Sequence, residues 1–495
     1  MKVLSKIEPL NVFQYFEEIC GIPHGSGNMD AISQYLVKFA KERNLFYIQD
    51  ESRNVIIIKE ATKGYENALP VMIQGHMDMV AVKDENCDID LEKDGLRLKT
   101  EGDYIFADGT SLGGDDGIAV AYALAILDSD VIPHPKLEVI FTVDEEVGMV
   151  GATAIDLSGL KGKRLLNIDS EEEGIILSSC AGGTRVQSHI PLDFEDREGN
   201  GYKIVITGLL GGHSGCEIQK ERGNSNCLMG RILFELAQEL DFSLCGVEGG
   251  SKDNAIALET SATIVIEKRN ENQLIGFIKK IEQKFQKEFF MKDPGLKIIV
   301  TPITALELIG KKTIQSEGYL FPVLTKDSLG KVIKFLMMQP NGVQAMSAHI
   351  KGLVETSLNL GIIKTNKFEL IADQSIRSSL QSSKEALRDK VVMISESLGG
   401  TCRIFGDYPA WEYKEDSKIR DILVDVYQRQ YGKKPEIEAI HAGLECGIFS
   451  GKIKDLDCVS FGPNMKDIHT INERLCISST KRVWEFLLEI LKQCK

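Results

Sequence analysis

The sequence lacks any Cys-x-x-Cys pair, although it contains 11 cysteines among its 495 residues. Scattered single thiols in an odd number argue against zinc fingers and against a disulfide framework, and they are typical of reduced cysteines in the cytoplasm. The first residues also lack the long apolar region of a signal peptide. The apolar stretch at residues 117–127 is too short to cross a bilayer. We therefore expect a cytoplasmic protein with no membrane partner.

Positive charge is scarce as well, with 58 Lys and Arg against 73 Asp and Glu and a formal net charge of −15. A nucleic-acid-binding protein needs a basic face, so we expect no nucleic acid as a partner. The chain has no Gly-x-x-x-x-Gly-Lys-Ser/Thr motif and no Gly-x-Gly-x-x-Gly after a predicted strand, which argues against nucleotide binding. Its length and its 43% hydrophobic residues suffice for a large core in more than one domain.

The first part of the chain alternates helical and strand patterns. Strands rich in Val and Ile, separated by amphipathic helices, predict an α/β domain with a largely parallel, buried sheet. From about residue 186 the pattern changes to antiparallel strands mixed with helices, and the α/β pattern resumes near Ala410. We predict that residues 1–187 and 383–495 form one domain and that residues 188–382 form an α+β domain inserted in it.

An apolar run at residues 71–80 carries His76 and Asp78 at its end. Because side chains alternate along a strand, these two residues project to the same side. An imidazole that binds a metal needs its second ring nitrogen held by an acceptor, and a carboxylate commonly serves. The pair alone also fits a buried core histidine with a satisfied hydrogen bond.

Four acidic clusters follow the His76 pair along the chain. They contain Asp115 in a glycine-rich loop, Glu145 and Glu146 after a strand, Asp169 after another strand, and His469 near the end. In α/β sheets, sites form beyond the carboxyl ends of the strands. Carboxylates gathered there repel one another unless cations neutralise them. A mixed N/O ligand set suits zinc and tolerates manganese or cobalt, and a carboxylate that bridges two ions explains the excess of acids.

Each cluster has an ordinary alternative. The Gly-Gly-Asp-Asp-Gly segment fits a turn whose Asp caps a helix, and Glu145 with Glu146 fits a solvated helix start. Asp169 fits a solvated acidic loop. One metal site explains all of the clusters, and their order, with fewer assumptions.

The motifs also match a known family. They are Gly-His-Met-Asp-Met-Val (75–80), Leu-Gly-Gly-Asp-Asp-Gly-Ile (112–118), Thr-Val-Asp-Glu-Glu-Val-Gly (142–148), Gly-Gly-His-Ser-Gly (211–215) and His-Ala-Gly-Leu-Glu-Cys-Gly (441–447). Their order resembles the clan of aminopeptidases, carboxypeptidases and aminoacylases with two co-catalytic zinc ions. Within that clan the chain is similar, over nearly its whole length, to the aminoacyl-histidine dipeptidases, also called peptidase D or cytosol non-specific dipeptidases.

The resemblance implies an α/β peptidase domain with a mostly parallel sheet, interrupted by an α+β lid or dimerisation domain, and a homodimer built through that insert. It implies two Zn²⁺ ions, for which Mn²⁺ or Co²⁺ can substitute. The implied ligands are His76 and Asp169 for one ion, Glu146 and His469 for the other, and Asp115 as the bridging carboxylate. It also implies a cis peptide bond after Asp115, with Asp78 holding His76.

The reaction implied by the resemblance is hydrolysis of dipeptides such as Xaa-His and of other short unblocked peptides. A metal ion lowers the pKa of water from about 15.7 towards roughly 7, so Glu145 can act as the general base and then return the proton to the leaving amine. His213 would stabilise the oxyanion, Arg377 would pair with the substrate carboxylate, and His441 would line the pocket. A turn, a surface ion pair and a packing role are the respective alternatives.

Two other functions stay open at this point. An N-acyl amino acid deacylase would use the same chemistry with a differently shaped pocket. A non-catalytic binding protein would keep the fold and would be favoured by the loss of a ligand or of Glu145. The sequence retains all of these residues.

Overall fold

The computed structural model describes residues 3–303 and 320–495, which divide into two compact units. Unit 1 contains the chain up to Cys180 together with Trp411–Ala439 and Leu444–Lys495, and unit 2 contains Ala181–Ala410 and Ile440–Gly443. The inserted domain expected at residues 188–382 includes residues 304–319, which lie outside the described residues. None of the described helices combines the length and the apolarity that a membrane crossing requires.

Unit 1 is built on a mixed sheet. In spatial order its strands are β1 (Phe46–Gln49), β2 (Val55–Lys59), β6 (Leu137–Thr142), β3 (Val71–His76), β7 (Arg164–Asn167), β21 (Asp457–Ser460), β8 (Ile175–Cys180) and β20 (Glu436–Ile440). Strands β6, β3, β7 and β21 run parallel to one another, and every residue of β3 and β6 is buried. The expected α/β class is confirmed, with a parallel centre flanked by β2 and β8, which run antiparallel to it. The β1–β2 edge is antiparallel because a short turn, residues 50–54, joins those strands.

Most helices of unit 1 share one apolar core with this sheet, namely α1 (Leu10–Cys20), α2 (Asp30–Glu42), α3 (Gly114–Asp128), α10 (Lys418–Tyr431) and α12 (Ile477–Gln493). Helix α11 (Glu445–Lys452) packs on β21 and on the short helix α4 (Val150–Ala154). Helix α3 has no polar face after its first turn, and it is buried from Asp116 through Leu127. A helix that is apolar all round must lie inside the protein, so α3 fixes the loop before it against the sheet.

A small antiparallel sheet in unit 1 was not expected from the sequence. It pairs β4 (Leu98–Glu101), β5 (Tyr104–Ala107), β23 (Arg474–Cys476) and β22 (Met465–Lys466). These strands have at most four residues each, too few to show a clear period. The segment between β22 and β23 contains His469, whose φ of 61° lies in the left-handed region. The hairpin therefore carries His469, one of the ligands that the resemblance implies.

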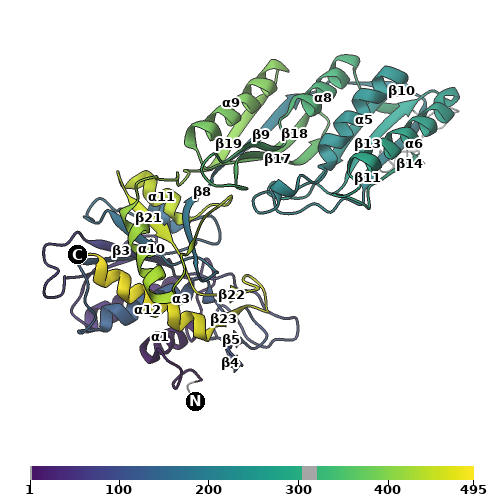
Figure 1. Cartoon of the computed structure of the whole chain (residues 1–495). Helices are drawn as coiled ribbons and strands as arrows, with labels where there is room; N and C mark the ends of the chain where they lie inside the picture. Colours follow the sequence, from purple (N-terminus) through teal and green to yellow (C-terminus); the bar gives the residue numbers. More distant parts are fainter. Residues whose placement is uncertain (1–2, 304–319) are drawn as a thin grey trace. The chain divides into compact units, whose positions relative to one another are not determined.

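Unit 2 is an antiparallel sheet with helices on one face (Figure 1). In spatial order its strands are β14 (Lys297–Ile303), β11 (Asn200–Thr207), β13 (Thr260–Ile266), β12 (Ser243–Gly249), β17 (Val354–Thr365), β18 (Glu369–Ser378), β9 (Gly182–Pro191) and β19 (Thr401–Tyr408). Strand β16 (Gly342–Met346) pairs with β17 beside this order. Strands β10 (Phe194–Glu198) and β15 (Leu320–Leu324) form a separate two-stranded sheet. The covering helices are α5 (Ser225–Glu239), α6 (Glu271–Glu288), α8 (Lys326–Met338) and α9 (Gln381–Ser397). Two short 3-10 turns are η1 (Ile218–Lys220) and η2 (Lys268–Asn270).

The compact unit extends beyond the expected end of the insert at residue 382. Helix α9 packs on β9 and β18, and β19 pairs with β9 along its length. An edge strand takes its partner from tertiary pairing, which leaves no local mark in the sequence. Unit 2 therefore continues to Ala410.

The N-terminus of α5 allows a test of unit 2. The side chain of Asn224 accepts hydrogen bonds from the amides of Asn226 and Cys227 and donates one to the carbonyl of Leu360. It is 4% exposed. We expect Asn224→Ala to cost about 2 kcal/mol, the sum of a lost cap and a lost buried hydrogen bond. Faster amide exchange at residues 226 and 227, with a lower denaturation midpoint, would show it.

The matched control is Asn272→Ala on the exposed face of α6. It should change the free energy of unfolding by less than about 0.5 kcal/mol. Equal effects of the two substitutions would contradict the capping role.

Candidate metal centre

Three adjacent parallel strands bring their last residues to one edge of the unit 1 sheet. His76 ends β3, Glu145 and Glu146 follow β6, and Asp169 follows β7. Strand β3 lies between β6 and β7 with all three parallel, so their carboxyl ends meet. This is the edge at which ligands bind in open α/β sheets.

Asp115 lies between two imidazoles. Its Oδ1 is 3.2 Å from Nε2 of His76, and its Oδ2 is 3.1 Å from Nε2 of His469. The peptide bond between Asp115 and Asp116 is cis, as the resemblance implied. The two carboxylate oxygens thus face different histidines, which is the arrangement a bridging ligand needs.

Each histidine has a second carboxylate beside it. Nε2 of His76 is 3.7 Å from Oδ1 of Asp169, and Nε2 of His469 is 2.9 Å from Oε1 of Glu146. The groups close enough to hold an ion among the described residues are His76 with Asp116 and Asp169, His76 with Glu145 and Glu146, and Asp115 with Glu146 and His469. The structure thus brings together all five of the expected ligands.

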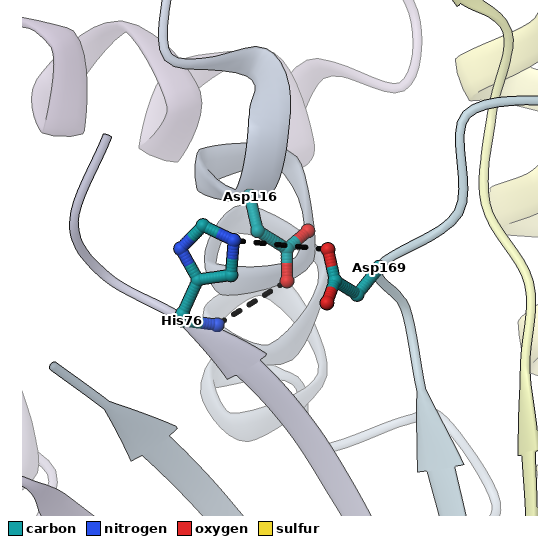
Figure 2. A group of neighbouring side chains, drawn as sticks. All are labelled: His76, Asp116 and Asp169. Atoms are coloured by element: carbon teal, nitrogen blue, oxygen red, sulfur yellow. Dashed lines mark hydrogen bonds and ion pairs between the residues drawn. The ribbon is translucent and has the colours of Figure 1, made fainter. Parts of the chain in front are cut away.

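Asp116 was given no role from the sequence, yet it lies beside His76 and Asp169 (Figure 2). Its Oδ2 accepts a hydrogen bond from the backbone amide of His76 at 3.2 Å. The side chain is fully buried, and burial, followed by the charge of Asp169, raises its pKa well above the ordinary value. Asp116 therefore anchors the end of β3, while Asp115 is the carboxylate that reaches both imidazoles.

Asp78 connects His76 to the segment after β6. Nδ1 of His76 donates to the backbone carbonyl of Asp78 at 2.9 Å, and the Asp78 carboxylate lies 3.5 Å from the same nitrogen. That carboxylate also accepts from the hydroxyl of Ser26 at 2.8 Å and from the backbone amide of Glu145 at 3.0 Å. The residue thus orients the imidazole mainly through its carbonyl, and its side chain fixes the Glu145 backbone.

The charges at this edge favour a bound cation. Burial raises the pKa of Asp169 to about 6 and raises that of Glu145 well above the ordinary value. Hydrogen bonds with Asp115 and then Glu146 raise the pKa of His469 to about 10. Without a cation, carboxylates can stay charged here only beside a protonated imidazole. A donor set of two His and several carboxylates fits a pair of divalent ions such as zinc.

Glu473 is a further residue whose role was not recognised in the sequence. Its carboxylate accepts hydrogen bonds from the amides of Leu112 at 2.8 Å, Gly113 at 3.1 Å and Gly114 at 2.8 Å, and it is 3% exposed. The amide of Asp115 lies 3.4 Å from the same carboxylate. Glu473 therefore holds the loop that carries Asp115. In the sequence, only the position of Glu473 close to His469 could have indicated this role.

The remaining expected site residues belong to unit 2. Ser357 and Arg377 are cross-strand partners on β17 and β18, and the Ser357 hydroxyl is 2.7 Å from Nε2 of His441. Burial, followed by the charge of Arg377, lowers the pKa of His441 to about 3 and also lowers the pKa of His213. His213, Arg377 and His441 therefore form one cluster in unit 2, with Arg377 donating to the Tyr408 hydroxyl at 3.1 Å.

Comparisons with known proteins bear on this arrangement. The family profile described as Peptidase family M20/M25/M40 matches residues 72–493. The cytosol non-specific dipeptidase of Escherichia coli (strain K12) is 35% identical over 497 residues, which cover 100% of this chain and 99% of that protein.

Solved structures of peptidases are also similar to this chain. The aminoacylhistidine dipeptidase from Vibrio alginolyticus is 36% identical with a TM-score of 0.89, and the alignment covers 99% of this chain and 98% of that chain. The aminopeptidase PepT from Bacillus cereus ATCC 10987 is 15% identical with a TM-score of 0.55, covering 99% of both chains, which shows a shared fold alone.

Proton release on metal loading tests the charge state of the site. Burial opposes the charge on His76, but its hydrogen bonds with Asp115, Asp169 and Asp78 outweigh this and raise its pKa well above 6.5. His469 is likewise protonated at pH 7.5, since its pKa is about 10. Metal ligation needs neutral imidazoles, so loading the stripped protein should release about two protons, one for each histidine. Calorimetry in buffers of different ionisation enthalpy measures this.

The direction in which proton release changes with pH follows from the raised pKa values of the histidines. The stability that protonated His469 contributes through its hydrogen bonds to Asp115 and Glu146 is fully present below its unfolded-state pKa of about 6.5, and it is lost as the pH rises through about 10. Proton release should therefore fall over the same range, and His469→Ala should release about one proton fewer. A binding enthalpy that is independent of the buffer would contradict this account.

Proposed function

The chain belongs to peptidase family M20/M25/M40, and from that premise we propose that it is a dipeptidase that hydrolyses short unblocked peptides with two bound metal ions. The observation that carries the proposal is the position of the Asp115 carboxylate, one oxygen facing His76 and the other facing His469. The full-length similarity to proteins named cytosol non-specific dipeptidase and aminoacylhistidine dipeptidase supports dipeptides, Xaa-His among them, as the substrate class.

The proposed ligands follow the two halves of the site. His76 and Asp169 would hold one ion, Glu146 and His469 the other, and Asp115 would touch both. We propose zinc as the native metal because the donors mix imidazole nitrogen with carboxylate oxygen; Mn²⁺ and Co²⁺ suit the same set. When bound, the cations would polarise the peptide carbonyl and lower the pKa of water.

Glu145 is the proposed general base. Burial and the charges of Asp169, Glu445 and Glu146 raise its pKa, and His76 opposes them. A carboxylate whose pKa is raised holds a proton more readily, so it can accept one from water and later donate it to the leaving amine. The hydrogen bond from its amide to Asp78 holds its backbone while the side chain exchanges that proton.

The unit 2 cluster supplies the proposed contacts to the substrate. Arg377 would pair with the substrate carboxylate. Its buried Nε has no hydrogen-bond partner among the described residues, so one N–H donor of the guanidinium is available for that contact. His213 would stabilise the oxyanion. His441 would line the pocket as a neutral side chain, because its pKa is about 3.

Location and assembly are part of the same proposal. We propose a cytoplasmic homodimer, as the family resemblance implies. All 11 cysteines are free thiols, which suits a reducing compartment.

A substrate panel tests the proposed function. Chelator-stripped protein reloaded with zinc, manganese or cobalt should cleave free dipeptides, Xaa-His included, and should leave N-acylated dipeptides intact. Cleavage of only the acylated set would favour a deacylase. Metal and peptide binding without turnover would favour a non-catalytic binding protein.

The role of Glu145 has a matched test in its neighbour. Glu145→Gln should retain both metals and lose turnover by about 10³-fold, because it removes only the group that moves the proton. Glu146→Gln should lose metal as well, because it changes a ligand. Metal analysis and steady-state kinetics on both variants separate the two roles. Near-normal turnover in Glu145→Gln would refute the assignment.

A further inference from the structure

Beneath the metal centre, three neighbouring strands each direct one polar side chain into the same buried cluster. Gln74 lies on β3, Thr142 ends β6 and Asn167 ends β7, and all three are fully buried. The amide of Asn167 donates to the Gln74 carbonyl oxygen at 2.6 Å, and the Gln74 amide lies 3.2 Å from the Thr142 hydroxyl. The three side chains therefore form one chain of hydrogen bonds across the sheet.

Each of these side chains lies just upstream of proposed site residues. Gln74 precedes His76 by two positions, so both project to the same side of β3. Asn167 stands two positions before Asp169, and Thr142 stands three before Glu145. A shift of any strand end in this cluster would move the ligand or the base that follows it.

Glu445 closes the cluster from another element. It is the first residue of α11 and is fully buried. Its Oε2 accepts a hydrogen bond from the Thr142 hydroxyl at 2.7 Å and another from the Gln74 amide. One carboxyl oxygen thus joins β3 and β6 to α11, and Asn167 adds β7 through Gln74.

We propose that Glu445 is a positioning residue for the metal centre, which fixes the ends of β3, β6 and β7 so that the ligands after them stand at coordination distance. The proposal rests on the function given above and deepens it. Glu445 belongs to the His-Ala-Gly-Leu-Glu-Cys-Gly segment, from which the sequence suggested a role for His441 alone.

The burial of this group argues for a positional role. A buried carboxyl group costs free energy, and an apolar side chain of similar size is often neutral or stabilising in its place. Oε1 of Glu445 has no hydrogen-bond partner among the described residues, so the group is incompletely satisfied. Burial raises its pKa to about 8, which favours the uncharged acid at neutral pH. A Gln side chain reproduces that acid in size and keeps an acceptor oxygen.

The test uses three variants of the full chain. Glu445→Leu removes the acceptor, and Glu445→Gln keeps it. The matched control is Glu138→Leu, since Glu138 is another buried carboxyl on β6 that accepts from the amides of Lys161 and Gly162. The measurements are the affinity of the stripped protein for Co²⁺ against a competing chelator, the Co²⁺ absorption spectrum, and the melting temperature.

Glu445→Leu should weaken at least one metal site by about 10-fold and alter the Co²⁺ spectrum, which reports ligand geometry. Glu445→Gln should restore both. Glu138→Leu should lower the melting temperature and leave metal affinity and spectrum unchanged. Wild-type metal binding in Glu445→Leu, an equal loss in Glu138→Leu, or a Gln variant as impaired as the Leu variant would each overturn the proposal.

Thr142→Val provides a second route if Glu445→Leu does not fold. It removes one hydrogen-bond donor to Glu445 while keeping the shape of the side chain. Metal affinity should therefore fall, as in Glu445→Leu. An unchanged Co²⁺ spectrum would overturn the proposal. Metal binding does not depend on which peptide is cleaved. A wild-type protein that binds two ions without cleaving dipeptides would contradict the proposed function. The effect of Glu445 on metal binding could still be measured in that protein.

Discussion

Carboxyl groups crowd the carboxyl edge of the parallel strands in unit 1, and their mutual repulsion is the constraint on which the site depends. Asp115 and Asp169 are mostly buried there, close to His76. Two such carboxylates can ionise together only beside positive charge. Protonated imidazoles supply it in the metal-free protein, and divalent cations would supply it in the working enzyme. Asp116 shows the same repulsion in a smaller degree, because its pKa is raised first by burial and then by the charge of Asp169.

Much of unit 1 could be predicted because its signals are local. The apolar run that ends at His76 forms β3, and the small-residue stretch after Asp115 forms the buried helix α3. That acids gather beyond parallel strand ends could be predicted from the sequence, and the resemblance to the dipeptidase family then implied which of them are ligands. The α/β class, the peptidase family and the dipeptidase relationship are confirmed by the comparisons. The individual site roles, the homodimer and the domain boundaries stay predictions.

What could not be predicted depends on contacts between distant residues. Glu473 lies about 360 positions from the loop whose amides it binds, and no periodicity marks such a pairing. Glu445 is likewise far from Gln74 and Thr142, so its buried cluster becomes visible only in three dimensions. The sheet edge at β19 leaves no local signal in the sequence, because its partner, β9, lies far upstream. Local motifs therefore pointed to the expected ligands, and only tertiary contacts revealed the residues that hold them.

In the proposed site, Asp115 would stand between two metal ions. Anomalous diffraction from crystals of the stripped protein soaked in Zn²⁺ would locate those ions. We expect two zinc peaks, one beside His76 and Asp169 and one beside Glu146 and His469, with the Asp115 carboxylate in contact with both. A single peak, or two peaks that do not share Asp115, would contradict it.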